Sequence, residues 1–390
     1  MVRMLSVVML LIFSLPFLAI CAEVEFAPFA SPEFNPSRGE EFRIPVKLSK
    51  EAEVSVTIFT ADGDPIATLA KVETLNPGSH EFLWDGKDAQ GVIVPDDAYV
   101  PVLSAKLRDG KTIDIDPRTF SGGEVVEDLN VEVTSTQEII YYLPAPSRVL
   151  IRVGVKNGPM MRSLVNWVPK ATGKNIQRWN GFDADNLIDL RNNERLSVLV
   201  TAYRLPKYSF ASIGNDKLSY VEYRSKKAFP EAIRDISGIE LERDGKRISR
   251  NYYMPRFKDL DPKVLMAFVG NIQKTVEGIP ILEDSTTIKV DIPEEDRRLI
   301  EESLYEVAFF VDGEFVSEEE QGYMPITWSY KPVGLTSGNH TLTVNVSSLS
   351  GQVGVKSLLF NVPNKAQLAE SGSALYLSQA DPEFLIGQGE

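Results

Sequence analysis

The sequence predicts an all-β protein made of tandem β-sandwiches, and three observations support this fold class. A set of glycines and large apolar residues recurs 95 positions later without a gap. Apolar and polar residues alternate over short runs, as in half-buried strands. Turn-forming residues separate the runs roughly every eight to twelve positions, which is typical of β-sandwiches. The recurring residues, each with its second copy, are Leu48 and Leu143, Gly63 and Gly158, Leu69 and Leu164, Gly78 and Gly173, Trp84 and Trp179, Gly86 and Gly181, and Asp88 and Asp183.

Each copy of the repeat should therefore form one sandwich. Strands are expected in the first copy at 42–48, 54–58, 66–72, 80–84 and 99–107. A turn at 62–65 separates two of them, because Gly63 tolerates positive φ and Pro65 cannot extend a ladder. The second copy has the same order, with strands at 139–143, 149–153, 164–168, 176–179 and 196–205. The copies diverge after Asp183, where a loop of different sequence is tolerated.

A third sandwich, of a different subfamily, is expected in the C-terminal part of the chain. Strand-like runs lie at 264–269, 287–290, 305–311, 326–330, 340–346 and 355–362, with one or two helical turns at 294–302. The segment 217–262 is either a mobile connector or a hairpin with strands at 239–241 and 246–248 around Asp244 and Gly245, since Asp-Gly favours a tight turn. The predicted organisation is a leader at 1–22, sandwiches at 23–107, 126–216 and 263–363, the connector at 217–262, and a flexible tail at 364–390.

The N-terminus has the pattern of a secretory signal peptide. Arg3 precedes an apolar run over 7–20, and small residues follow it. The run is shorter than the ~20 residues that a membrane-spanning helix needs. We therefore expect an exported protein that is periplasmic, displayed on the cell surface or extracellular. Cys21 is the only cysteine, which excludes a disulfide within one chain.

Cys21 is also a candidate for lipidation. Residues 18–21 partly resemble a bacterial lipobox, although Ile20 stands where that pattern has a small residue. Ordinary cleavage after Cys21 or Ala22 is the favoured interpretation. The chain would contact a membrane only if Cys21 carried a lipid.

The first copy resembles the FlgD-type immunoglobulin-like domain, which is named for the flagellar hook-capping protein and is widespread in exported bacterial proteins. The resemblance rests on Asn35-Pro36-Ser37, on the strands at 44–49 and 54–58, and on Trp84-Asp85-Gly86-Lys87-Asp88 with Gly78 six residues before the tryptophan. The second copy matches more loosely, through Tyr142-Leu143-Pro144 and Trp179-Asn180-Gly181-Phe182-Asp183. This resemblance implies immunoglobulin-like or fibronectin III-like β-sandwiches and a structural or adhesive role, without catalytic residues to transfer. The segment at 310–351 is similar to other bacterial immunoglobulin-like domains.

The side chains needed for common catalytic and cofactor sites are scarce. The chain has two histidines, His80 and His340, and each lies two residues after a glycine at the expected start of a strand. A hydrolytic triad needs a histidine beside a nucleophile, and both positions have a structural explanation. No cysteine or histidine pair has zinc-ligand spacing, and no phosphate-binding glycine loop precedes a helix. We expect no catalytic residues, no cofactor and no enzyme activity.

Carboxylates are plentiful, but most lie in predicted turns, where they should be solvated. Asp62, Asp64, Asp96 and Asp97 are examples. Paired carboxylates can hydrolyse glycosides, but no such pair can be located. Calcium is the one metal that the composition suggests, because hard cations bind clustered carboxylates. The candidate positions are Asp85 and Asp88 in the first copy and Asp183, Asp185, Asn186 and Asp189 in the second, although none forms a complete calcium loop.

The net charge of −14 argues against nucleic-acid binding, because the chain would not neutralise phosphates. The charge is concentrated at 291–320, with 12 acidic and 2 basic residues, whereas 207–262 has 12 basic and 9 acidic residues. Acidic side chains and nearby aromatic residues are therefore candidate partner contacts. They are Glu318, Glu319, Glu320, Trp328 and Tyr330.

These observations predict a non-enzymatic structural, scaffold or protein-binding component of the bacterial envelope or exterior. Its partner would be another envelope or extracellular protein, or a second copy of the chain. A carbohydrate-binding or adhesive surface protein is the alternative, with tryptophans or tyrosines stacking on sugars. Trp84 and Trp179 occupy one repeated position, which favours a role for both in core packing.

Overall fold

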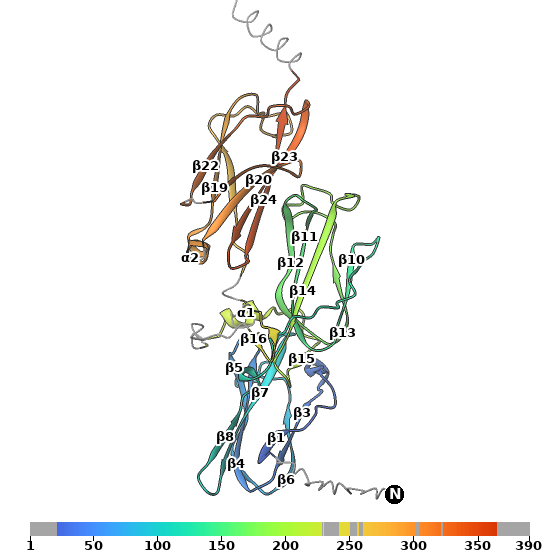
Figure 1. The fold of residues 1–390 in the computed structure, drawn as a ribbon, viewed down its shortest axis with the longest axis vertical. Coiled ribbons are helices and arrows are strands. Elements are labelled where there is room, and N and C mark those ends of the chain that lie inside the picture. Colours follow the sequence, from blue (N-terminus) through green and yellow to red (C-terminus); the bar gives the residue numbers. More distant parts are fainter. Residues whose placement is uncertain are drawn as a thin grey trace, which may run out of the picture.

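The computed structural model describes residues 22–227, 229, 242–249, 256, 260–301, 304–320 and 323–364. Figure 1 shows three β-sandwiches that follow one another along the long axis of an elongated molecule. Cys21, with the leader, and the tail from 365 onward lie outside the described residues. In the part that is described, no helix is both long enough and apolar enough to cross a bilayer.

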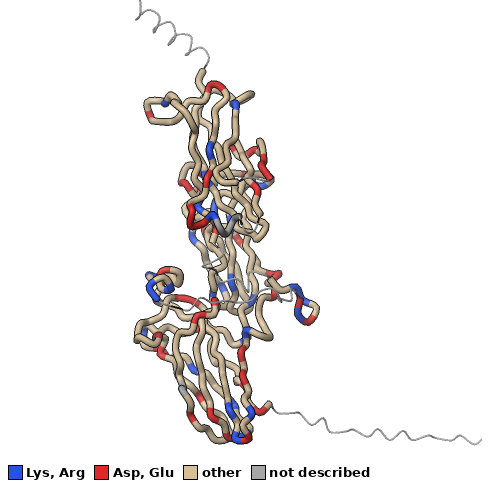
Figure 2. The backbone as a smooth tube through the Cα atoms, turned by 90° about the vertical axis from the view of Figure 1, so that its left-hand side faces the viewer, with Lys and Arg blue, Asp and Glu red and all other residues tan. Residues whose placement is uncertain are grey.

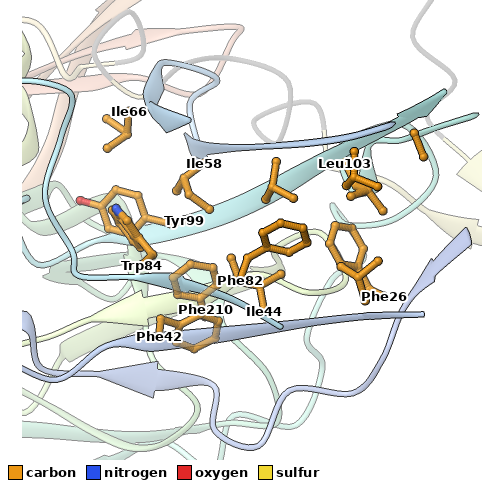
Figure 3. Close-up of a cluster of buried hydrophobic side chains, with 14 of the residues drawn as sticks. Phe26, Phe42, Ile44, Ile58, Ile66, Phe82, Trp84, Tyr99, Leu103 and Phe210 are labelled. Carbon is orange, nitrogen blue, oxygen red and sulfur yellow. The ribbon is translucent and has the colours of Figure 1, made fainter. Parts of the chain in front are cut away.

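The first sandwich packs a three-stranded sheet against a larger one. The smaller sheet has the order β1 (Val24–Phe26), β3 (Phe42–Leu48), β6 (Gly78–Trp84). The larger sheet has the order β2 (Glu33–Phe34), β15 (Phe210–Ser212), β7 (Ala98–Leu107), β4 (Ala52–Thr60), β5 (Pro65–Leu75), and β8 (Thr112–Ile115) pairs with β7. Alternate residues of β3 and β4 point inward, as their sequence pattern predicts, and form the core in Figure 3. The 3₁₀ turns η1 (Pro36–Arg38) and η2 (Pro117–Thr119) follow β2 and β8.

The second sandwich is formed by two three-stranded sheets. One has the order β13 (Gly173–Arg178), β10 (Glu138–Leu143), β9 (Glu132–Val133), and the other β12 (Met160–Lys170), β11 (Ser147–Val155), β14 (Leu196–Arg204). The ladder between β10 and β13 pairs Leu143 with Gly173, and the ladder between β3 and β6 pairs Leu48 with Gly78. Both pairs are offset by the repeat length, so the two copies share one strand register.

The third sandwich has the same strand order as the second, with β24 (Val353–Val362) added at one edge, so the strand order does not support the prediction of a separate subfamily. One sheet has the order β18 (Leu265–Val269), β19 (Thr286–Asp291), β22 (Ile326–Tyr330). The other has the order β21 (Glu314–Glu319), β20 (Tyr305–Val311), β23 (Gly338–Ser348), β24 (Val353–Val362). Helix α2 (Glu294–Glu301) lies where a short helix was expected. The all-β fold of tandem immunoglobulin-like or fibronectin III-like sandwiches is confirmed.

Two predicted boundaries are wrong, because distant segments complete the first sandwich. Strand β8 extends that domain beyond residue 107. Strand β15, expected within the second sandwich, pairs with β2 and β7 of the first. Phe210 stacks on Phe42 with ring centroids 3.6 Å apart and lies in the first core. The last strand of the second sandwich therefore ends at Arg204.

The connector contains the predicted hairpin and also an unpredicted helix. Strands β16 (Glu242–Arg243) and β17 (Lys246–Arg247) pair around Asp244 and Gly245, which both have positive φ. The strand expected at 239–241 lies outside the described residues. Helix α1 (Tyr220–Ser225) begins at Ser219, whose side chain accepts a hydrogen bond from the Glu222 amide. Figure 2 shows the charged hairpin standing out from the body between the first and second sandwiches.

Candidate functional site at the junctions between the sandwiches

The predicted partner-contact residues do not form one surface. Glu318 and Glu319 are exposed on β21, and Glu320 follows them. Trp328 lies on β22, in the opposite sheet, and its half-buried ring stacks on Phe309 at 4.2 Å. The prediction that Tyr330 is a contact residue is wrong, because this side chain is 8% exposed and belongs to the core of the third sandwich.

The repeated tryptophans lie in the cores, as predicted. Trp84 is 1% exposed and Trp179 is 8% exposed. Each indole nitrogen donates a hydrogen bond to a carbonyl three residues later, Trp84 to Lys87 at 2.9 Å and Trp179 to Phe182 at 2.8 Å. Buried tryptophans usually satisfy their N–H in this way. Such buried rings cannot stack on a sugar.

The calcium candidates are engaged by other groups. Asp183 accepts hydrogen bonds from two backbone amides, those of Leu187 and Ile188. Asp189 pairs with Arg191 at the surface, and hydrogen bonding to that guanidinium lowers the pKa of Asp189 to about 2. Across the described residues, no cluster of three histidine, cysteine or acidic side chains could hold a metal ion.

Both histidines contact the turn that precedes their strand. His80 Nε2 lies 2.7 Å from the Asn76 carbonyl, and His340 Nε2 lies 2.8 Å from the Thr336 carbonyl. His340 Nδ1 also lies 2.6 Å from the Asp312 carboxylate. These contacts give both rings a structural role.

The first junction, between the first and second sandwiches, contains a buried ionic cluster. Arg148 projects from β11, and its Nη2 atom lies 2.7 Å from Asp62 Oδ1 and 3.0 Å from the Ala61 carbonyl. Arg256 adds a second guanidinium, with its Nε atom 3.2 Å from Asp62 Oδ2 and its Nη2 atom paired with Asp97. All four charged side chains are at least 96% buried. The cluster thus joins two sandwiches and the distant Arg256.

The electrostatics of this cluster follow from its burial. Burial by itself raises the pKa of the Asp62 carboxyl, but the guanidinium groups of Arg148 and Arg256 hold that pKa below its ordinary value. Burial raises the pKa of Asp97, with a further contribution from the nearby Asp62 charge. Burial lowers the pKa of Lys170, which lies within reach of the same charges.

Helix α1 covers the same end of the first sandwich. The Tyr220 hydroxyl donates to Asp64, and Arg224 Nε lies 2.9 Å from the same carboxylate. One helical turn further on, the Tyr223 hydroxyl donates to Asp88 at 2.7 Å. Lys227 also pairs with Asp88, so two buried carboxylates hold the helix in place.

The prediction that the turn carboxylates are solvated is therefore wrong for Asp62, Asp64 and Asp97, which are 1–4% exposed. Sequence reasoning also missed their partners. One signal was present, because Arg148 directly precedes the apolar run 149–151 of a mostly buried strand, and a buried charge requires a partner. Nothing local identifies which carboxylate that partner is.

The second junction, between the second and third sandwiches, is mostly a hydrogen-bonded contact. The Asn345 side chain donates to the Met160 carbonyl and accepts from the Met160 amide, both at 2.8 Å, and so acts as a strand backbone would. Asp185 accepts a hydrogen bond from the Ser357 amide at 2.7 Å and pairs with Lys356. The calcium candidate Asp185 is thus part of this junction.

Two further contacts bring the backbones of the second and third sandwiches close together. Arg195 Nη2 lies 3.0 Å from the Gly313 carbonyl. A Cβ atom on Gly158 would lie 2.6 Å from the same oxygen. Real Cβ contacts are never this short, so the third sandwich can pack here only because residue 158 has no side chain.

A groove of about 930 Å³ lies beside the first junction. It is formed by the segment 124–130, the end of β10 and the hairpin turn. Tyr142, which is 44% exposed, lines it together with charged residues of both signs. These residues are Glu124, Glu127, Asp128, Arg204, Lys246 and Arg247.

Comparison with known proteins identifies no family. No family model matches the sequence, and no curated protein matches it. Three solved structures are similar to this chain over most of its length. Fibronectin(III)-like modules of Clostridium thermocellum CbhA are 11% identical, with 87% of this chain and 94% of that chain covered and a TM-score of 0.19. A tetra-tandem repeat from the extending region of a large adhesion protein is 14% identical, covering 87% and 73%, with a TM-score of 0.18.

The third is a bacterial ice-binding adhesin, 11% identical, with 88% of this chain and 98% of that chain covered and a TM-score of 0.17. Because all three scores are far below 0.5, these likenesses carry no argument about fold or function. The FlgD-type resemblance stays a prediction. The fold itself follows from the sheets and cores of this chain.

Proposed function

We propose that this protein is a non-enzymatic exported scaffold or protein-binding component of the bacterial envelope or cell exterior. The observation that carries the proposal is the use of buried polar side chains at both junctions. Arg148, Arg256 and Asn345 each connect parts of the chain that are remote in sequence. Their contacts hold the three sandwiches in one extended arrangement, which suits a protein that keeps binding surfaces at a set distance.

The physical reason is that a buried ion pair contributes more to geometry than to stability. Desolvation of both partners offsets most of their attraction, so an apolar replacement is often as stable. An apolar contact tolerates sliding, whereas a guanidinium between carboxylates is satisfied in few orientations. The first junction therefore acts as a stiff connection between the sandwiches.

The finer assignments belong to the same proposal. The first two sandwiches are FlgD-type domains, supported by the shared hydrogen bond at the Trp-Asp-Gly turn of Trp84 and the corresponding turn of Trp179. The leader directs export, and the partner is a second protein or another copy of the chain. Nucleic acid is not a partner, and the chain contacts a membrane only if Cys21 carries a lipid.

Crosslinking in the native cells, followed by affinity capture and mass spectrometry, tests the proposal. One recurrent stoichiometric protein, or crosslinked copies of the chain itself, would support it. A parallel capture with Arg148→Met should recover less of that partner, because the sandwiches would no longer hold their spacing. Recovery of glycan alone would contradict the scaffold function.

The alternative is carbohydrate binding, and one observation favours it. The groove beside the first junction presents Tyr142 among polar side chains, an arrangement that suits stacking on a sugar ring. The buried Trp84 and Trp179 do not contribute. A glycan array with Tyr142→Ala as control tests this alternative: binding that this substitution abolishes would support it, and no binding would exclude it for the glycans tested.

A further inference from the structure

Strand β21 is an edge strand of the third sandwich with an unusual combination of side chains. It pairs with β20 on one side, and no other strand among the described residues pairs with it. Phe315 is 54% exposed and Val316 is 41% exposed, and Glu314, Glu318 and Glu319 are exposed as well. Exposed apolar residues on an open edge favour pairing with another strand, and the carboxylates select which strand.

Strand β13 of the second sandwich is an edge strand of the opposite charge. It has the same length of six residues and pairs only with β10 among the described strands. Lys174, Ile176 and Arg178 are all exposed and alternate along the strand, so they share one face. Ile176 is 48% exposed. β13 thus offers an apolar residue beside the cation Lys174, whereas Arg178 pairs with Glu138 of β10 at 2.9 Å.

The pairing of β21 with β20 shows which residues a new strand would meet. A bulge places Phe310 opposite Phe315 and Ala308 opposite Glu318. Because of the bulge, two steps along a partner strand match three steps along β21. The partner residues opposite Phe315 and Glu318 are therefore two positions apart and lie on one face of their strand. In an antiparallel ladder with Ile176 opposite Phe315, the residue opposite Glu318 is Lys174. An apolar pair and an ion pair then lie side by side.

We propose that β13 of one copy adds to β21 of a second copy of this chain. Because the contact joins different surfaces of the two copies, a pair of copies keeps one free β13 and one free β21. Further copies can add at these free strands and form a staggered linear assembly. This inference rests on the proposed scaffold function and identifies the partner as the chain itself. Copies with a net charge of −14 repel each other in general, which leaves the complementary edges as the favoured contact.

Sedimentation equilibrium of the full chain tests the proposal, from about 1 μM to about 1 mM, which spans weak to moderate affinities. The wild-type chain should self-associate. Lys174→Glu and Glu318→Lys should each weaken association by about tenfold, because each places like charges opposite one another. An equimolar mixture of the two variants should associate like the wild type, since every edge then finds an opposite charge on the other variant.

Matched controls carry the same charge changes elsewhere. Lys106→Glu on β7 and Glu73→Lys on β5 alter exposed side chains and should leave association unchanged. A monomeric wild-type chain throughout the range, or a mixture that stays as weak as the single variants, would overturn the proposal. A monomeric chain that still captures a distinct envelope protein on crosslinking would overturn this inference and leave the scaffold function intact.

Discussion

Arg148 and Asp62 form an ion pair between two sandwiches, and their side chains are 1% and 0% exposed. Asp62 Oδ1 also accepts a hydrogen bond from the Arg256 amide at 2.9 Å, so one carboxylate holds two remote parts of the chain. Removing Arg148 would leave the buried Asp62 with Arg256 as its remaining cation, and removing Asp62 would leave the buried Arg148 without its carboxylate partner. This relationship leads to the first prediction.

Arg148→Ala should lower the free energy of unfolding by about 3–5 kcal/mol, because it leaves Asp62 buried without this partner. Chemical denaturation followed by tryptophan fluorescence measures the change. Arg43→Ala is the matched control: its pair with Glu81 has side chains 61% and 43% exposed and should contribute about 0–1 kcal/mol. Equal losses for the two variants would refute a special role for the junction.

Gly158→Ala should disrupt the second junction while leaving each sandwich folded. The added Cβ atom would lie 2.6 Å from the Gly313 carbonyl, and overpacking of this kind costs about 1–3 kcal/mol. Small-angle scattering should show a changed maximum dimension with unchanged circular dichroism. Asn345→Ala removes the two hydrogen bonds to Met160 and should also change the maximum dimension, although it introduces no steric clash. An unchanged scattering profile for both variants would argue that this contact does not position the third sandwich.

The stability of the third sandwich should fall as the pH rises through the range in which His340 loses its proton. Burial lowers the pKa of His340, but hydrogen bonds with Asp312 and the Thr336 carbonyl raise it above its ordinary value. The protonated form therefore stabilises the fold. That contribution is complete below the ordinary histidine pKa and is lost as the pH passes the raised folded value.

Denaturation midpoints of the wild type and of His340→Gln, between about pH 5 and pH 9, measure this effect. The wild-type midpoint should decline with rising pH, and the variant should lack that decline. Asp312→Asn should also flatten the curve, since it removes the carboxylate 2.6 Å from His340 Nδ1. A decline that survives both substitutions would assign the pH dependence to other groups.

Reversing Glu318, Glu319 and Glu320 to lysine should weaken partner capture at low salt. These exposed carboxylates on and after β21 are screened at high ionic strength, so the difference from the wild type should shrink as salt is added. Capture from crosslinked cells at two salt concentrations checks this. Capture that does not depend on the reversal at either concentration would show that the partner binds elsewhere.

Strand positions and the repeat were predictable because they depend on local chemistry. Alternating apolar residues define β3, and the glycine that opens β6 recurs as the glycine that opens β13. The shared tryptophan turn follows from the same local signal, since Trp84 bonds to a carbonyl only three residues away. Interactions between residues that are close in sequence depend on short sequence patterns, so they can be predicted from the sequence alone.

What only the tertiary structure decided are the contacts between remote residues. Asp62 and Asp97 resemble solvated turn residues until Arg148 and Arg256 are placed beside them, 86 and 159 positions away along the chain. Phe210 follows the second sandwich in sequence yet completes the core of the first. A turn carboxylate and a strand phenylalanine are each compatible with several environments. The packing of whole sandwiches selects among them, because that packing determines which distant side chains are excluded from water together.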